Sequence, residues 1–129
     1  KTISAYGASV LTSSIDLASA RIEFQTGETA NLTASRISLK QMRQMRIFQK
    51  NSYSVVDFQH QKLNTWKIDS RQKLQSVNQA TTENNALFEE LNHFIKSIQH
   101  DLLEKVRAEE AFEALTIASK IQKKIAKKQ

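Results

Sequence analysis

Apolar side chains recur through the second half of the chain at alternating steps of three and four residues. Counted from Met42, the register takes in Met42, Met45, Gln49, Ser52, Val56, Gln59, Leu63, Trp66, Ser70, Lys73, Val77, Ala80, Asn84, Leu87, Leu91, Phe94 and Ile98. A mean spacing of 3.5 residues places side chains along a narrow helical seam and is typical of coiled coils. The polar middle of the register predicts a weak rod that tolerates a bend.

The later part of this register is its most apolar part and predicts a surface for partner helices. We expect the binding residues to be Val77, Ala80, Asn84, Leu87, Leu91, Phe94, Ile98 and Leu102. Asn84 stands at an a-type position, where a single polar residue fixes the register of a coiled coil and lowers its stability. These residues are therefore expected to bind helices of other proteins or of a second copy.

Both ends of the chain carry a broader apolar stripe. Its N-terminal members are Ile3, Val10, Leu11, Ile15, Ala18, Ile22 and Phe24. Its C-terminal members are Leu102, Val106, Ala111, Leu115, Ala118 and Ile125. A stripe with a period near 3.6 residues is typical of helices in a globular bundle. We therefore expect the two ends of the chain to pack on one another.

The composition favours helices, because residues that form tight turns are scarce. The chain has 129 residues, no proline and two glycines, Gly7 and Gly27. Antiparallel sheets ordinarily use glycine and proline at their turns. The predicted fold class is therefore all-α: an elongated helical hairpin or a three- to four-helix bundle with coiled-coil segments. Within one helical region, 1–129, the predicted helices lie near residues 4–25, 29–50, 54–80 and 82–127, with the last two continuous in one version.

Two helical architectures remain open at this point. In the first, the chain folds back near residues 27, 52 and 83 into a bundle. In the second, residues 42–127 form one long helix whose seam other chains bury. The polar middle of the seam argues against a self-sufficient rod, so the favoured version is a hairpin or bundle that completes its core with partner chains.

Charge is distributed unevenly along the chain. The net charge is +6, and the last sixteen residues carry five lysines and no acidic residue. Two basic segments, 36–50 and 120–128, predict contacts with an anionic partner. The residues concerned are Arg43, Arg46, Lys50, Lys120, Lys123, Lys124, Lys127 and Lys128. The simpler alternative is a solvated helix end, since lysines in a last turn interact favourably with the helix dipole.

Residues for catalysis are hard to find in the sequence. There is no cysteine, which excludes thiolate chemistry and disulfides. Glu90 and His93 have the spacing of half a di-iron site, but no second Glu-x-x-His exists. Neither a glycine-rich phosphate loop nor a nucleophile elbow is present. We therefore predict no enzyme activity, no cofactor, no metal site and no small-molecule substrate.

The function predicted from these patterns is a non-enzymatic interaction subunit, a structural protein that forms oligomers or assembles complexes through coiled-coil or bundle seams. One alternative is an extracytoplasmic ligand-sensing four-helix bundle of a receptor. Another is an electrostatic binder of nucleic acid or of an anionic membrane. No run of about twenty apolar residues is present, and the lack of cysteine favours an intracellular location. Because the first residue is Lys1, we expect a processed form or a fragment.

Overall fold

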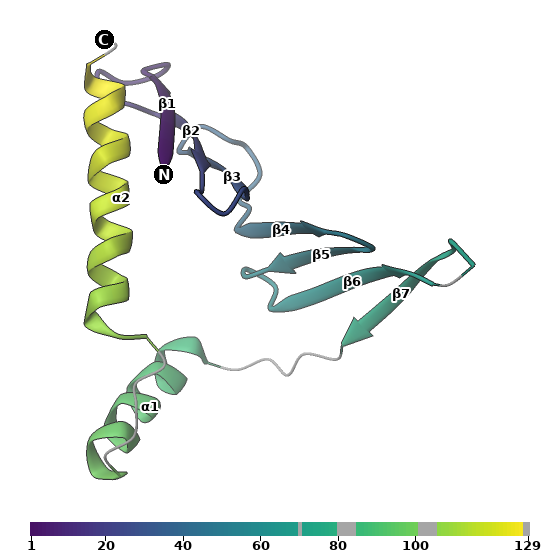
Figure 1. Ribbon diagram of the computed structural model, residues 1–129. Helices are drawn as coiled ribbons and strands as arrows, with labels where there is room; N and C mark the ends of the chain where they lie inside the picture. The colour runs from purple at the N-terminus through teal and green to yellow at the C-terminus, as the bar shows by residue number, and fades with distance from the viewer. Residues whose placement is uncertain (70, 80–84, 101–105, 128–129) are drawn as a thin grey trace. The chain divides into compact units, whose positions relative to one another are not determined.

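The computed structural model describes residues 1–69, 71–79, 85–100 and 106–127, and β-strands dominate it. The elements in chain order are β1 (Thr2–Ala8), β2 (Leu17–Glu23), β3 (Thr29–Ser35), β4 (Gln44–Gln49), β5 (Ser52–Asp57), β6 (Lys62–Ile68), β7 (Leu74–Gln79), α1 (Ala86–His100) and α2 (Ala108–Ala126) (Figure 1). The strands form two antiparallel sheets, in the orders β1-β2-β3 and β4-β5-β6-β7. The first sheet and α2 belong to one compact unit, Lys1–Leu39 with Leu103–Gln129, and the second sheet and α1 to another, Lys40–Leu102.

This architecture corrects the all-α prediction. The ranges predicted as the first three helices, 4–25, 29–50 and 54–80, hold the seven strands. Within the fourth range, 82–127, α1 and α2 are helical, and residues 101–105 lie outside the described residues. The apolar register from Met42 to Val77 runs over four strands. The described part of the chain is therefore mostly β-sheet with two helices, and it is not an all-α bundle.

The turns between strands are made largely without glycine, which explains why the scarcity of glycine misled the fold prediction. Asn51, Gln61 and Gln72 take left-handed conformations, with φ of 65°, 51° and 58°. Gly27, with φ of 99°, lies between β2 and β3. Asparagine tolerates this conformation better than most residues, whereas glutamine is seldom used for it. The sequence around the two glutamines therefore carries no ordinary turn signal.

Aspartate side chains hold two of these turns. Oδ1 of Asp57 accepts hydrogen bonds from the backbone N–H groups two and three residues further on, both at 3.0 Å. Oδ1 of Asp69 accepts from the N–H groups two and four residues further on, at 2.8 and 2.9 Å. Such local bonds give the backbone an alternative to helix and favour a turn.

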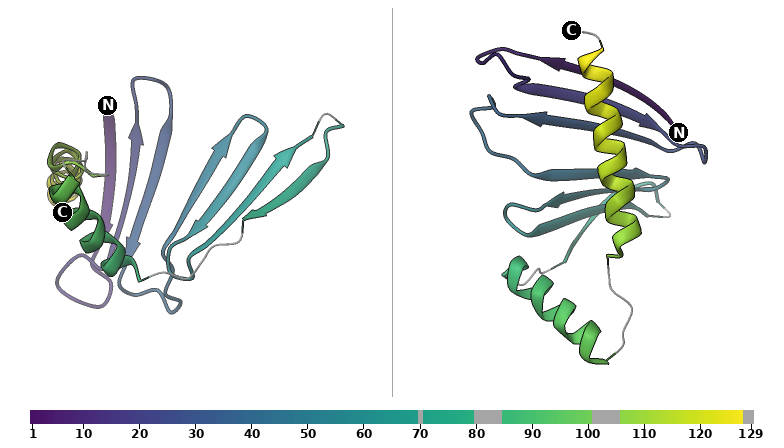
Figure 2. Two further views of the ribbon diagram at one scale, coloured as in Figure 1. Left: turned by 90° about the horizontal axis from the view of Figure 1, so that it is seen from below. Right: turned by 90° about the vertical axis from the view of Figure 1, so that its left-hand side faces the viewer.

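The core of the first unit lies between α2 and one face of β1 and β2 (Figure 2). The register pairs Ile3 with Ile22 and Ala5 with Ala20, and all four side chains are buried. Ile125 of α2 is buried against the two alanines. On the other face, the alternate residues of both strands are exposed, except Leu17, which is half-buried. This period of two residues follows from the pleat of a strand.

Gly7 allows α2 to approach β1 closely. A Cβ atom at position 7 would collide with Cγ2 of Ile125 and would lie 3.1 Å from Cγ2 of Ile15. The packing at this point has no room for a methyl group. The two ends of the chain do pack on one another, but as a helix on a sheet and not as the partner helices of a bundle that the apolar stripes predicted.

The second unit is built on the four-stranded sheet. One face carries three stacked rings, from Phe48, Tyr53 and Trp66, with centroids 4.7 and 5.3 Å apart. The register places these residues opposite one another across β4, β5 and β6. On the other face, the hydroxyls of Ser54 and Thr65 are hydrogen-bonded at 3.0 Å. Cross-strand side-chain pairs of these kinds stabilise an antiparallel sheet.

Both helices begin with local capping bonds. Oδ1 of Asn85 accepts a hydrogen bond from the N–H of Phe88 at 3.2 Å, at the start of α1. At the start of α2, the carboxylate of Glu110 accepts from the N–H of Arg107 at 3.0 Å. These bonds satisfy backbone groups that a helix leaves without partners at its first turn. Neither helix has the length and apolar character needed to cross a membrane.

Candidate functional site

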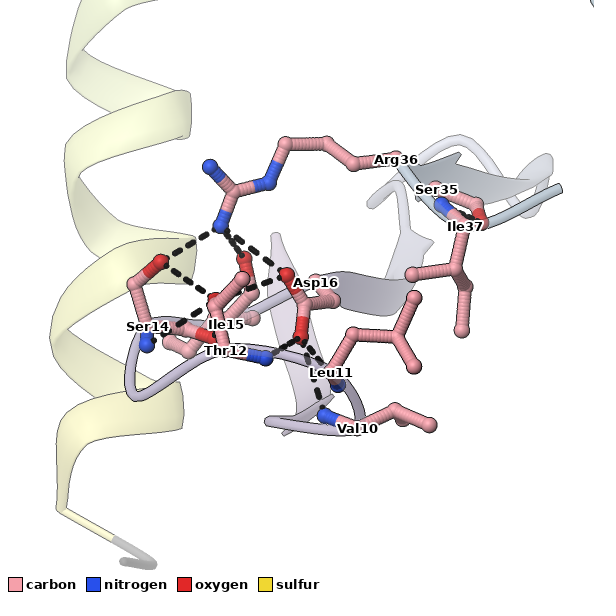
Figure 3. Close-up of polar contacts among 9 residues, drawn as sticks. All are labelled: Val10, Leu11, Thr12, Ser14, Ile15, Asp16, Ser35, Arg36 and Ile37. Atoms are coloured by element: carbon pink, nitrogen blue, oxygen red, sulfur yellow. Dashed lines mark hydrogen bonds and ion pairs between the residues drawn. The ribbon is translucent and has the colours of Figure 1, made fainter.

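A dense set of hydrogen bonds surrounds Asp16, at the end of the loop between β1 and β2 (Figure 3). Oδ2 accepts from the backbone N–H groups of Val10, Leu11 and Thr12, at 3.0, 2.9 and 3.0 Å. Oδ1 accepts from the hydroxyl of Thr12 at 2.9 Å. The side chain of Asp16 is only 2% exposed. A single carboxylate thus holds the two ends of the loop together.

These donors lower the pKa of Asp16 well below its usual range. The backbone N–H of Thr12 contributes most, followed by that of Leu11, and burial opposes them. Hydrogen bonds to the charged form of a carboxyl favour that form. Asp16 is therefore ionised at neutral pH and is not available as a general acid.

Arg36, directly after β3, joins this loop to the far edge of the sheet (Figure 3). Its Nη2 donates to Oγ of Ser14 at 2.6 Å and to the carbonyl oxygen of Ile15 at 2.7 Å. The same nitrogen lies 3.3 Å from Oδ1 of Asp16. Arginine carries five N–H donors in a planar fork, and these bonds use one nitrogen of an exposed side chain. We define Asp16, Arg36 and the loop residues between Val10 and Ile15 as the loop clamp.

The sequence interpretation missed the loop clamp. The only local signal is the polar run Thr12-Ser13-Ser14 followed by the alternating residues Ala18, Ala20 and Ile22. A polar run followed by alternating apolar and polar residues is typical of a loop that leads into a strand. Nothing local indicates Arg36, because it lies twenty residues beyond Asp16.

A groove of about 740 Å³ lies between β1 and α2, within the first unit. Five lysines line it: Lys120, Lys123 and Lys124 from α2, Lys127 directly after α2, and Lys1 just before β1. We call this the lysine groove. The ammonium group of Lys1 also lies 5.6 Å from the centre of a phenylalanine ring, that of Phe24. The four helix lysines are exposed and have no ion-pair partner in the described part of the chain.

The other end of the lysine groove differs in chemistry. It is lined by Phe112, Glu113, Thr116 and Ile117 of α2, and Ile3 of β1 contributes an apolar side chain. On a helix, residues three or four apart are neighbours on one face. Glu113 and Lys120 are seven residues apart, which corresponds to about 10 Å along the helix axis at 1.5 Å per residue. The groove has a cationic end and a mixed end with a ring, a hydroxyl and a carboxylate.

The structure divides the predicted anion contacts into two groups. Four of the lysines come together in the lysine groove: Lys120, Lys123, Lys124 and Lys127. The other described residues lie in the second unit, at β4 and its flanks: Arg43, Arg46 and Lys50. The guanidinium carbon of Arg43 is 5.9 Å from the centre of the Phe58 ring. Lys128 lies outside the described residues.

The predicted partner seam is also divided. Leu87, Leu91, Phe94 and Ile98 share one side of α1 and are 52 to 66% exposed. Val77 is on a strand, β7. Ala80, Asn84 and Leu102 lie outside the described residues. The seam is therefore not one continuous helix face, and binding of a partner by the α1 residues stays a prediction.

The histidines form no metal centre in the ranges that the structure describes. Nδ1 of His60 lies 3.0 Å from Oδ2 of Asp57 at the turn between β5 and β6. This contact, followed by a bond from Gln44, lowers the pKa of Asp57. Among the described residues, no three histidine, aspartate or glutamate side chains come close enough together to hold a metal ion. The pair of His60 and Asp57 is a surface contact that supports the turn.

Comparison with known proteins adds a likeness to one enzyme. No family model matches the sequence. A curated relative, UDP-N-acetylglucosamine 3-dehydrogenase of Acidithiobacillus ferrooxidans, is 39% identical over 56 residues. The aligned part is 43% of this chain and 18% of that protein.

Two solved structures of the A. ferrooxidans enzyme, named GnnA, share the fold. In the P21 crystal form the TM-score is 0.87 at 24% identity, over 96% of this chain and 40% of that chain. In the P212121 form the TM-score is 0.85 at 26% identity, over 97% and 40%. The chain thus spans about 40% of the length of the solved enzyme.

These findings correct the predicted function. A chain with this sheet architecture is not a coiled-coil or helical-bundle assembly subunit, and the receptor-sensor and electrostatic-binder alternatives are set aside with it. The prediction of no enzymatic role is wrong in the same way, because the proteins that it resembles in sequence and structure are a dehydrogenase. The chain has the fold of a part of that enzyme.

Proposed function

We propose that this chain contributes the antiparallel sheets and C-terminal helices of a dehydrogenase that acts on a UDP-activated amino sugar. One observation carries the proposal: a TM-score of 0.87 over 96% of the chain to UDP-N-acetylglucosamine 3-dehydrogenase. The 39% identity over 56 residues supports it from the sequence. The chain matches only a part of the relative. We therefore infer from the chemistry of the reaction which tasks this part of the enzyme performs.

Dehydrogenation of a secondary alcohol has three requirements. A hydride leaves the carbon for an acceptor, a proton leaves the hydroxyl for a base, and the sugar is held so that both transfers occur in one geometry. Dinucleotide acceptors are commonly held by a glycine-rich turn between a strand and a helix. This chain has two glycines, twenty residues apart, and no such turn. We therefore assign acceptor binding to the part of the dehydrogenase outside the match.

The role left for this chain is to bind and orient the sugar nucleotide. Antiparallel strands are rigid supports for such a task, and precise sites are better built on strands and helices than on loops. The loop clamp adds rigidity at the one long connection in the first sheet, because a buried carboxylate and an arginine fix residues 10 to 16. Sugar-nucleotide binding by the chain itself is the consequence to test.

The test is a ligand-observed NMR titration of the chain with UDP-N-acetylglucosamine. We expect saturation transfer from the protein to the sugar and uridine protons. Free N-acetylglucosamine, which lacks the nucleotide, serves as the matched control and should show little transfer. If the nucleotide sugar shows no transfer at millimolar concentration while circular dichroism confirms folded protein, sugar-nucleotide binding does not belong to this chain.

A further inference from the structure

We infer that the lysine groove binds the diphosphate group of a small organic ligand. The inference stands on the charges and shape of the groove. Only the identification of the ligand as a UDP sugar rests on the proposed function. The claim goes beyond that function because it assigns a place on this chain and an orientation to the bound molecule.

The positive charge on one side of α2 has no compensating carboxylate among the described residues. Lys120, Lys123, Lys124 and Lys127 fall within about 10 Å along the helix axis, at 1.5 Å per residue, and all line the groove. Like charges three or four residues apart destabilise a helix. No carboxylate in the described residues forms an ion pair with any of the four. A bound anion would remove this repulsion.

The helix dipole does not supply the attraction. Three of these lysines stand in the last two turns of α2 and Lys127 is its C-cap, at the end where the dipole places about half a negative elementary charge. That partial charge opposes an anion, but it is small beside four full positive charges. The groove therefore holds its anion with ammonium groups, unlike phosphate sites at helix N-termini, where backbone N–H groups bind.

The sign of the side-chain charges changes along α2. Its first half carries Glu109, Glu110 and Glu113, and the four lysines lie in its second half and at its C-cap. A long polyanion lying along α2 would meet these carboxylates and be repelled. A short anion confined to the lysine end avoids them. The distribution of charge thus favours a small ligand over a nucleic acid or an extended lipid surface.

The size and lining of the groove also suit a small organic ligand. Its volume of about 740 Å³ lies inside the range of roughly 300 to 1,000 Å³ typical of small-molecule sites. Inorganic phosphate alone would leave most of it unfilled. Phe112 and Ile117 offer apolar contact, and Thr116 and Glu113 can hydrogen-bond hydroxyls. We place the diphosphate at the lysines and the uncharged, hydroxyl-bearing part of the ligand near Phe112.

The experiment is a titration of the labelled chain with inorganic pyrophosphate, followed by two-dimensional ¹H–¹⁵N NMR at about 50 mM salt, where exposed charges are weakly screened. We expect shift changes confined to β1 and the second half of α2. The double variant Lys123→Gln/Lys127→Gln should lower the affinity about tenfold or more, since close charges to phosphate dominate such binding. Lys123→Arg/Lys127→Arg should restore most of it.

The matched control is Lys62→Gln/Lys67→Gln on β6, which makes the same change in net charge in the other unit. It should leave the affinity within about twofold. An equal loss in both double variants, shifts scattered over both units, or no shift at all would overturn the site. Stronger binding to phosphatidylglycerol vesicles than to pyrophosphate, lost in the groove variant, would assign the lysines to a lipid surface and also overturn it.

A second arm separates this inference from the proposed function. UDP-N-acetylglucosamine should bind in the groove, lose affinity in Lys123→Gln/Lys127→Gln and shift amides near Phe112. If the sugar nucleotide binds equally well to that variant, the groove inference fails and the proposed function stands. If pyrophosphate binds in the groove and the sugar nucleotide does not bind, the groove stands and the proposed function fails.

Discussion

Gly7 sets the distance between a helix and a sheet through the absence of a side chain. Ile125 of α2 occupies the space that a Cβ atom would need, and Ile15, in the loop between β1 and β2, lies close to the same point. We expect Gly7→Ala to lower the free energy of unfolding by about 1 to 3 kcal/mol, the usual result of adding a methyl group to a filled core. Urea denaturation followed by circular dichroism measures this change.

A double-mutant cycle shows whether the loss comes from this contact. Ile125→Ala removes the colliding Cγ2 atom, so the added methyl group at position 7 should cost less in that background. Equal costs in the two backgrounds would mean that the effect of Gly7→Ala arises elsewhere, for example in the backbone of β1.

The free energy of unfolding depends on pH through the ionisation of Asp16. Its pKa is lowered in the folded protein, chiefly by the backbone N–H of Thr12, whereas in the unfolded chain it is near the ordinary value of about 3.9. A group with a lowered folded pKa contributes stability above its unfolded pKa, and this contribution is lost as the pH falls toward the folded value. We expect the melting temperature of Asp16→Asn to lie below that of the wild type at pH 7.

The same comparison across pH checks the sign. The difference in melting temperature between wild type and Asp16→Asn should be constant above about pH 5 and should shrink steadily below about pH 4, where the unfolded wild-type chain takes up a proton. A difference that is the same at pH 3 and pH 7 would show that the carboxylate charge is not what holds the loop. The melting should be followed by circular dichroism. Fluorescence of Trp66 would report on the other unit and not on the unit that contains Asp16.

The sequence indicated candidate site residues only where these residues lie close together along the chain. Lys120, Lys123, Lys124 and Lys127 were recognised as a group, since they stand close together in the sequence at the end of one helix, whereas Lys1, which also lines the groove, was not. Asp16 and Arg36 were missed, because their contact depends on the pairing of β2 with β3. A pattern read over a few turns of helix contains no information on such a contact.

At the scale of elements, α2 is held to its sheet by a few apolar side chains. Ile125 is buried against Ala5 and Ala20, and Ile121 is partly buried beside it. We expect Ile125→Ala to lower the free energy of unfolding by about 2 to 5 kcal/mol. Leu115, on the same helix, is 69% exposed, so Leu115→Ala should change it by no more than about 0.5 kcal/mol. Urea titrations of the two variants, which remove groups of equal size, make the comparison.

A similar loss of unfolding free energy in both variants would contradict the burial of Ile125 and the exposure of Leu115. It would indicate that Leu115 is covered in solution, for instance by association of two chains, and sedimentation of the Leu115→Ala variant would then show a lower mass than that of the wild type.

The strands of the second unit show how an apolar spacing of 3.5 residues arises without a helix. Met45, Val56 and Leu63 are members of the predicted helical register, and in the structure they are cross-strand neighbours on one face of the sheet. Strands of six or seven residues joined by short turns return an apolar residue to the same face at intervals that resemble heptad spacing. The side chains do lie side by side, but backbone hydrogen bonds between strands bring them there.

At the scale of the whole molecule, the buried core is small. The buried apolar residues within the described ranges are Ile3, Ala5, Ala20, Ile22 and Ile125, all in the first unit. The denaturant dependence of stability scales with the surface that unfolding exposes. We therefore expect a shallow urea transition for the chain alone, with an m-value near or below about 1 kcal/mol per molar, the lower end for small proteins.

Circular dichroism and tryptophan fluorescence should be followed together in this titration, because Trp66 reports on the second unit and helix content partly on the first. A single steep transition with an m-value in the upper half of the usual range would contradict the prediction. It would mean that the chain in solution buries far more surface than its described residues do.

The sequence by itself determined the local chemistry of this protein. It excluded thiol reactions, placed four lysines along one side of the C-terminal helix, and indicated that the two ends of the chain pack together. These properties depend on residue identity and on neighbours within a few helical turns. Only the tertiary structure decided that seven strands lie between Thr2 and Gln79, that Asp16 meets Arg36, and that the chain has the fold of part of a dehydrogenase. The physical reason is that strands are joined by hydrogen bonds between distant segments, so their stability depends on partners that a local apolar period does not reveal.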